Sequence, residues 1–169
     1  MLEKRRSELL LLGVATFVLA IDQLTKALVL RYLPFQSPWN PIPFLRSIVT
    51  LNHVTNTGAA FGLFPEGSLF FTLIAVVVVI AIVVYYRHLP QNQRLVQVSL
   101  GLQLGGAIGN LLDRLHYGKV IDFIDFHFWP VFNVADSSIF IGVIILAYYL
   151  FFLSGKQVKQ SERLDQPGS

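Results

Sequence analysis

The chain has 169 residues, of which 54% are hydrophobic and only 14% are charged. A soluble domain is typically about 25% charged, so this composition excludes an ordinary soluble protein. The mean hydropathy of +0.60 excludes intrinsic disorder, and the lack of cysteine excludes disulfide scaffolds and thiol chemistry. We interpret the net charge of +3 as a sign of membrane topology, because Lys and Arg collect on the cytoplasmic side of membrane proteins.

Four long apolar runs follow one another along the chain, and each is long enough to span a bilayer, which takes about 20 apolar residues. They predict helices over residues 9–30, 69–86, 95–114 and 137–153. The first run follows basic residues as a secretory signal peptide does, but no cleavage site of small residues comes after it, so we expect it to be retained. We therefore predict an all-α integral membrane protein, one domain over residues 1–169, with outer loops 31–68 and 115–136 and a polar tail 156–169.

The basic residues divide unequally between the two sides of this topology. Eight lie at the termini or between the second and third runs, namely Lys4, Arg5, Arg6, Arg87, Arg94, Lys156, Lys159 and Arg163. The other side holds Arg31, Arg46 and Lys119, with Arg114 near a helix end. This bias predicts that both termini are cytoplasmic.

Two smaller patterns concern packing and the long outer loop. Gly101, Gly105 and Gly109 recur every four residues, so one face of the third helix should allow a neighbouring helix to approach closely. The outer loop contains a strand-like stretch over residues 47–53 and turn signals at 56–58 and 65–67.

The polar residues within the apolar runs converge at one depth. With a rise of about 1.5 Å per residue, Asp22 lies about 20 Å and Asn110 about 22 Å from the cytoplasmic ends of their helices. Asp113 and Arg114 follow just beyond, and Asp136 directly precedes the fourth helix. A charge deep in a bilayer costs roughly 2.5–3.5 kcal/mol, so this cluster at the outer boundary needs an explanation.

Structural roles account for part of the cluster. Asp22 and Lys26 are spaced to pair on one helix face, and we favour that role. Asp113 and Arg114 could anchor the end of the third helix, which we weigh equally against ligand binding by Arg114. Asn133 or Asp136 is expected to cap the fourth helix. The four histidines share no spacing, so we expect no metal site.

The segment 120–136 is aromatic, as expected at the headgroup level, yet it carries Asp122, Asp125 and Asp136. Two carboxylates in a partly dry site share a proton, so that one can act as general base on water and the other as general acid. This predicts an aspartic-protease dyad. The alternatives are a small transporter or channel component that uses Asp22, Lys26 and Arg114, or a scaffold or assembly subunit without chemistry. Nucleic acid is not expected as a partner, because no basic patch lies outside the tails.

Five motifs in order resemble those of the lipoprotein signal peptidases, bacterial membrane aspartyl proteases that act on prolipoproteins. The motifs cover residues 22–26 (DQLTK), 52–62 (NHVTNTGAAFG), 105–114 (GGAIGNLLDR), 120–123 (VIDF) and 132–137 (FNVADS). The resemblance extends over nearly the whole chain.

This resemblance implies residue roles by position. The catalytic pair falls on Asp122 and Asp136, whereas Asp125 lies outside the dyad. Substrate-binding positions fall on Asn56, Asn110, Arg114 and Asn133, and supporting positions on Asp22, Lys26 and Asp113.

The resemblance also implies a fold, partners and a location. The outer loop is expected to form a small β-cradle at the membrane surface with a short lid. The implied partners are diacylglyceryl-modified prolipoproteins, cleaved before the lipidated cysteine, together with membrane lipid and globomycin-type inhibitors. No cofactor is implied, and the location is the bacterial cytoplasmic membrane with the site on its outer side. The short spacing between the last two motifs leaves the shape of the loop 125–131 open.

Overall fold

The structure, a computed structural model, describes residues 2–57, 68–86 and 93–153. Four long helices account for most of it: α1 (Leu2–Tyr32), α2 (Ser68–Tyr86), α3 (Arg94–Tyr117) and α4 (Val134–Tyr148), the last continued by a π-helical segment, η3 (Tyr149–Leu153). Each is long and apolar enough to cross a membrane. The four predicted spans are confirmed. The turn signal at 65–67, the last residue of the one at 56–58, and the polar tail lie outside the described residues.

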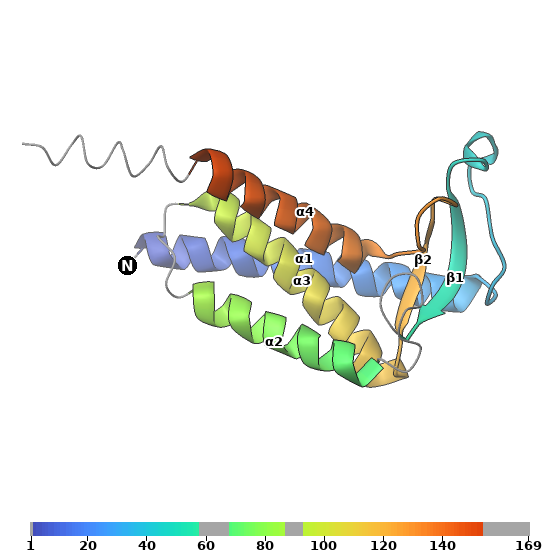
Figure 1. Cartoon of the computed structure of the whole chain (residues 1–169), viewed down its shortest axis with the longest axis horizontal. Coiled ribbons are helices and arrows are strands. Elements are labelled where there is room, and N and C mark those ends of the chain that lie inside the picture. Colours follow the sequence, from blue (N-terminus) through green and yellow to red (C-terminus); the bar gives the residue numbers. More distant parts are fainter. Residues whose placement is uncertain (1, 58–67, 87–92, 154–169) are drawn as a thin grey trace, which may run out of the picture.

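Helix α3 is the centre of the bundle, with α1, α2 and α4 packed around it (Figure 1). Its apolar stretch is 61% buried, whereas that of α2 is only 6% buried. Large side chains of the three outer helices, such as Phe17, Leu69 and Phe140, face outward. Apolar side chains on the outside are what a lipid environment requires, so this arrangement fits a membrane-embedded bundle.

The glycines of α3 allow backbone contact with two neighbours. A Cβ atom added at Gly105 would lie 2.5 Å from the carbonyl oxygen of Ala15 in α1, and one at Gly106 would lie 2.5 Å from that of Ala135 in α4. Gly101 similarly meets Leu11 and Val14 of α1. The predicted close packing along Gly101, Gly105 and Gly109 is confirmed, and Gly106 adds a second close contact.

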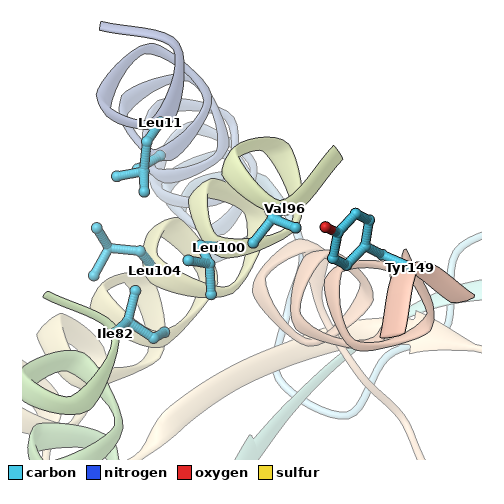
Figure 2. Close-up of a cluster of buried hydrophobic side chains, with 7 residues drawn as sticks. Leu11, Ile82, Val96, Leu100, Leu104 and Tyr149 are labelled. Carbon is cyan, nitrogen blue, oxygen red and sulfur yellow. The ribbon is translucent and has the colours of Figure 1, made fainter. Parts of the chain in front are cut away.

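At the end of the bundle that holds the N-terminus, helices α1, α2 and α3 and the segment after α4 form one hydrophobic cluster. Figure 2 shows Leu11 of α1, Ile82 of α2 and Leu100 of α3 converging there, with Tyr149 from the segment after α4. The buried members are Leu11, Ala15, Ile82, Val96, Leu100, Leu104 and Tyr149. This cluster fills the end of the bundle opposite to the buried charged residues Asp22, Lys26 and Asp113.

A two-stranded antiparallel sheet lies at that opposite end (Figure 1). Strand β1 (Thr50–Asn56) pairs with β2 (Val120–Asp125), with Val54 opposite Asp122 and an irregularity between Leu51 and Val54. The strand-like stretch was predicted at 47–53, three residues too early. A short 3₁₀ turn, η1 (Pro43–Leu45), precedes β1. Ile121 and Phe123 of β2 pack on Val29 of α1, which ties the sheet to the bundle.

The start of α4 differs from the sequence prediction. We expected the helix to begin after Asp136, but it begins at Val134 and Asp136 lies in its first turn. Asn133 is the N-cap: its side chain accepts a hydrogen bond from the Asp136 backbone N–H, and the Asp136 side chain accepts one from the Asn133 backbone N–H. This reciprocal capping box satisfies two backbone donors and explains the earlier start. Helix α3 likewise runs three residues beyond its predicted end, to a left-handed C-cap at Gly118.

Candidate active site

Asp122 and Asp136, the two residues of the predicted dyad, both lie at the sheet end of the bundle. Asp122 lies on β2, which follows α3, and Asp136 lies on the first turn of α4. Both line a pocket of about 260 Å³. The remaining lining residues are Asn56, Phe71, Asn110, Arg114, Val120, Trp129, Pro130, Val131 and Phe132. The pocket thus combines two carboxylates with mostly apolar and aromatic walls.

The Asp122 carboxylate is held on both oxygens. Asn56 Nδ2 donates to Oδ2 at 3.1 Å, and Asn133 Nδ2 donates to Oδ1 at 2.8 Å. Asn56 is within reach because Val54 pairs with Asp122 and Asn56 lies two residues further along the same face of β1. The residue is only 2% exposed, so its carboxylate is removed from solvent.

The environment of Asp122 favours its protonated form. Burial, and after it the negative charge of Asp136, raise the pKa of Asp122 to about 7. The hydrogen bonds from Asn56 and Asn133 and the positive charge of Lys26 act in the opposite direction but do not cancel the shift. Near neutral pH the two aspartates can therefore hold one proton between them, which general acid and base catalysis by a dyad requires.

Asp136 is oriented by two asparagines. Asn110 Nδ2 donates to its Oδ1 at 2.7 Å, and the Asn133 backbone N–H donates to its Oδ2 at 3.3 Å. Asn133 also donates through Nδ2 to Asn110 Oδ1 at 3.1 Å and is fully buried. Asn133 therefore contacts both aspartates from behind the pocket, whereas Asn56 and Asn110 line it.

Arg114 lies in the pocket wall rather than at a helix end, because α3 continues to Tyr117. Its Nη1 donates to the Asn110 backbone carbonyl at 3.3 Å. Its Nε is buried and has no hydrogen-bond partner among the described residues. A guanidinium with an unused donor beside the pocket is suited to bind an oxygen of a ligand.

The predicted pair of Asp22 and Lys26 is confirmed, with Nζ 2.8 Å from Asp22 Oδ2. The structure adds Asp113, whose Oδ2 lies 2.8 Å from the same Nζ. Asp113 thus belongs to a buried ion cluster and does not cap α3. All three side chains lie below the pocket lining.

Asp125 lies apart from the dyad. Its carboxylate accepts from the His127 backbone N–H at 2.8 Å and from Asn52 Nδ2 at 3.5 Å. The loop after β2 turns at His127, which has a left-handed backbone with φ 62°, and returns so that Phe132 pairs with Ile124. Within residues 2–57, 68–86 and 93–153, no three His, Asp or Glu side chains are grouped to hold a metal ion.

The sequence did not single out several residues that shape the site. Gln23 Nε2 donates to Asp22, Asp113 and the Gly109 carbonyl, which joins α1 to α3. Its place within the 22–26 motif was the only signal for this role. Phe71 of α2 and Trp129 line the pocket, and a single aromatic residue in an apolar run gives no such signal.

Comparisons with known proteins agree with this picture. A family model described as signal peptidase (SPase) II matches residues 14–152. The lipoprotein signal peptidase of Moorella thermoacetica is 46% identical over 147 residues, 87% of this chain and 96% of that protein. The one from Caldanaerobacter subterraneus subsp. tengcongensis is 46% identical over 143 residues, 84% of this chain and 96% of that protein.

Solved structures show the same architecture. One bacterial membrane enzyme, solved at 2.3 Å, superposes with a TM-score of 0.76 at 30% identity and covers 94% of this chain and 93% of its own. A second, solved at 1.9 Å, gives a TM-score of 0.76 at 32% identity and covers 85% of this chain and 94% of its own.

Proposed function

The chain belongs to the signal peptidase II family, membrane aspartic proteases that cleave signal peptides from prolipoproteins, and from this we propose that Asp122 and Asp136 are its catalytic dyad. The observation that carries the assignment is the shared pocket. Both carboxylates line it, and burial together with the second charge raises the pKa of Asp122 to about 7.

The proposed reaction needs one water molecule and one proton on the dyad. The ionised aspartate takes a proton from the water, and the resulting hydroxide attacks the carbonyl carbon of the scissile bond. The protonated aspartate gives its proton to the carbonyl oxygen. The tetrahedral intermediate then collapses: the proton taken from the water passes to the leaving nitrogen, and a hydroxyl proton of the intermediate returns to the second aspartate.

The pocket walls suggest the roles of the remaining polar residues. We assign substrate contact to Arg114, whose Nε has an unused donor among the described residues, and to Asn56 and Asn110, which line the pocket. Asn133 is fully buried and contacts both aspartates, so we assign it to holding the dyad. Asp22, Lys26 and Asp113 support the site from below.

We further propose that the substrates are diacylglyceryl-modified prolipoproteins, cleaved just before the lipidated cysteine. The pocket lies at one end of the membrane-spanning helices, and its wall includes Phe71, Trp129 and Phe132. An apolar wall at headgroup depth suits a peptide bond that is linked to acyl chains. Globomycin-type inhibitors would occupy the same pocket.

The proposed location is the cytoplasmic membrane of a bacterium, with both termini in the cytoplasm and the pocket facing outward. The excess of Lys and Arg at the termini and between α2 and α3 supports this orientation. The transporter alternative has no comparable support, because Lys26 forms ion pairs with Asp22 and Asp113 instead of lining a path through the bundle.

The test is cleavage of a diacylglyceryl prolipoprotein by the purified protein in detergent, with and without globomycin. Asp122→Asn and Asp136→Asn should each abolish cleavage, since neither variant can exchange the proton that the reaction needs. Asp125→Asn is the matched control, because it makes the same change on the same segment outside the pocket, and it should cleave at the wild-type rate. Full turnover by either dyad variant would show that the assignment is wrong.

A further inference from the structure

Lys26 lies at the centre of a buried polar cluster beneath the proposed dyad. Its ammonium group is 2.8 Å from Asp22 Oδ2, 2.8 Å from Asp113 Oδ2 and 3.0 Å from Asn110 Oδ1. A lysine ammonium has three N–H donors, so three acceptors saturate it. Lys26 and Asp113 are each 2% exposed and Asp22 is fully buried. The cluster therefore holds one positive and two negative charges away from solvent.

Two of the three acceptors also bind a backbone amide directly before a catalytic residue. Asp113 Oδ2 accepts from the N–H of Ile121 at 3.2 Å, and Ile121 precedes Asp122. Asp22 Oδ1 accepts from the N–H of Ala135 at 3.0 Å, and Ala135 precedes Asp136. One carboxylate thus holds the strand that carries one aspartate, and the other holds the helix turn that carries the second.

The third acceptor reaches the dyad through its side chain. Asn110 accepts from Lys26 through Oδ1, which leaves its Nδ2 to donate to Asp136 Oδ1 at 2.7 Å. The bond from Lys26 therefore fixes which end of the Asn110 amide faces Asp136. All three groups on Lys26 therefore bond, one contact further, either to a dyad residue or to the residue directly before one.

We propose that Lys26 is a positioning residue, whose three hydrogen bonds to Asp22, Asp113 and Asn110 set the relative positions of the Asp122 and Asp136 carboxylates. The proposal rests on the assignment of those two aspartates as the dyad. A buried ion cluster is not needed for stability alone, because replacing all its members with neutral groups of similar size is often tolerated. We therefore infer that the cluster serves to position the two aspartates rather than to stabilise the fold.

Lys26 also contributes charge. The charged groups around the dyad are Asp22 and Lys26 on α1, Asp113 and Arg114 on α3, and the two dyad residues Asp122 and Asp136. The positive charge of Lys26 lowers the pKa of Asp122, against the larger effect of burial. Removing this charge should therefore raise the pKa of Asp122 and move the alkaline limb of the activity profile to higher pH.

The experiment measures prolipoprotein cleavage, thermal stability and the pH dependence of kcat for four variants beside the wild type. Lys26→Met removes the cation and its donors but keeps the length of the chain. Lys119→Met makes the same change outside the ion cluster and is the matched control. A triple variant, Asp22→Asn with Lys26→Met and Asp113→Asn, removes every charge of the cluster, and Asp122→Asn marks loss of the dyad.

We expect Lys26→Met to lower kcat by on the order of 10²-fold with little change in KM, the effect of a displacement of about 1 Å at a reacting centre. Its alkaline limb should shift upward, and Lys119→Met should match the wild type. The triple variant should remain folded, since it leaves no unpaired buried charge, yet keep the low kcat.

The triple variant separates positioning from charge compensation. If Lys26 only neutralises two buried carboxylates, the triple variant will cleave at the wild-type rate, and the proposal is wrong. The same holds if Lys26→Met loses stability but keeps its kcat and pH profile per folded molecule. Failure of the proposed function looks different, because there the wild type does not cleave or Asp122→Asn still does.

Discussion

Asp122→Asn should make the protein inactive and, above neutral pH, more stable. The wild-type residue is 2% exposed and its pKa lies at about 7 in the fold, against an ordinary value of 3.8. A carboxyl group whose pKa is raised by folding prefers its protonated form in the native state. Its contribution to stability is therefore complete below pH 3.8 and is lost as the pH rises through about 7.

The expected change in the free energy of unfolding follows from the raised pKa of Asp122. A pKa change from 3.8 to about 7 corresponds to about 4 kcal/mol, at about 1.4 kcal/mol per unit. Asparagine is close to the protonated carboxyl group in size, carries no charge and does not ionise. Wild type and Asp122→Asn should therefore unfold with similar free energies at pH 4, and the variant should gain up to about 4 kcal/mol by pH 8.

The assay is denaturation in mixed detergent at a series of pH values, followed by tryptophan fluorescence. The chain has two tryptophans, and Trp129 lines the pocket, so the signal reports on the site itself. Asp125→Asn is the control, since this carboxylate lies outside the pocket. Its stability should follow the wild-type pH curve.

Parallel curves for wild type and Asp122→Asn would refute the reasoning. They would mean that the carboxyl ionises in the fold as easily as in the unfolded chain, so that burial and the Asp136 charge do not act on it. The proton-sharing step of the proposed mechanism would then lose its physical basis, even if cleavage still depended on both residues.

Two further predictions concern the elements that hold the dyad. Gly106→Ala should cost about 1–3 kcal/mol and slow cleavage, because the new Cβ would lie 2.5 Å from the Ala135 carbonyl oxygen and push α4 outward. Gly13→Ala, where a Cβ meets nothing within 4 Å, is the matched control and should be neutral or slightly stabilising by thermal unfolding. Equal effects of the two changes would count against close packing of α3 and α4. Asn133→Ala should cost about 0.5–2 kcal/mol through loss of the N-cap and abolish cleavage, because it also removes the donor to Asp122. Wild-type kcat in this variant, measured on detergent-solubilised protein, would contradict its role in holding the dyad.

The membrane spans could be predicted because the thickness of a bilayer sets the length of a helix that crosses it. Uniformly apolar runs leave little choice but membrane helices, and a constant rise per residue placed Asp22 and Asn110 within about 2 Å of the same depth. The structure joins them through Lys26, which bonds to both. Depth alone predicts that such residues meet, but not which atoms bond.

Contacts between distant parts of the chain could not be predicted from the sequence. The spacing of Asp22 and Lys26 revealed their pair, because both lie on one helix face. Asp113, the second partner of Lys26, is 87 positions away, and only the rotation of α3 against α1 brings it there. The predicted start of α4 after Asp136 was wrong because the sequence did not show which residue caps the helix. Either Asn133 or Asp136 could have been the N-cap, and in the structure the two residues form one capping box.

The distribution of polar groups explains why the site can exist within a membrane. Buried polar atoms cost free energy unless they are paired, and the asparagines and charged residues below the pocket bond to one another. The other end of the bundle is closed by the apolar cluster around Leu100 (Figure 2). Among the described residues, the polar groups around the dyad bond to one another, and Arg114 Nε is a buried donor in the pocket wall without a partner. The two aspartates of the proposed dyad are thus held at a pocket that lies at one end of the membrane-spanning helices.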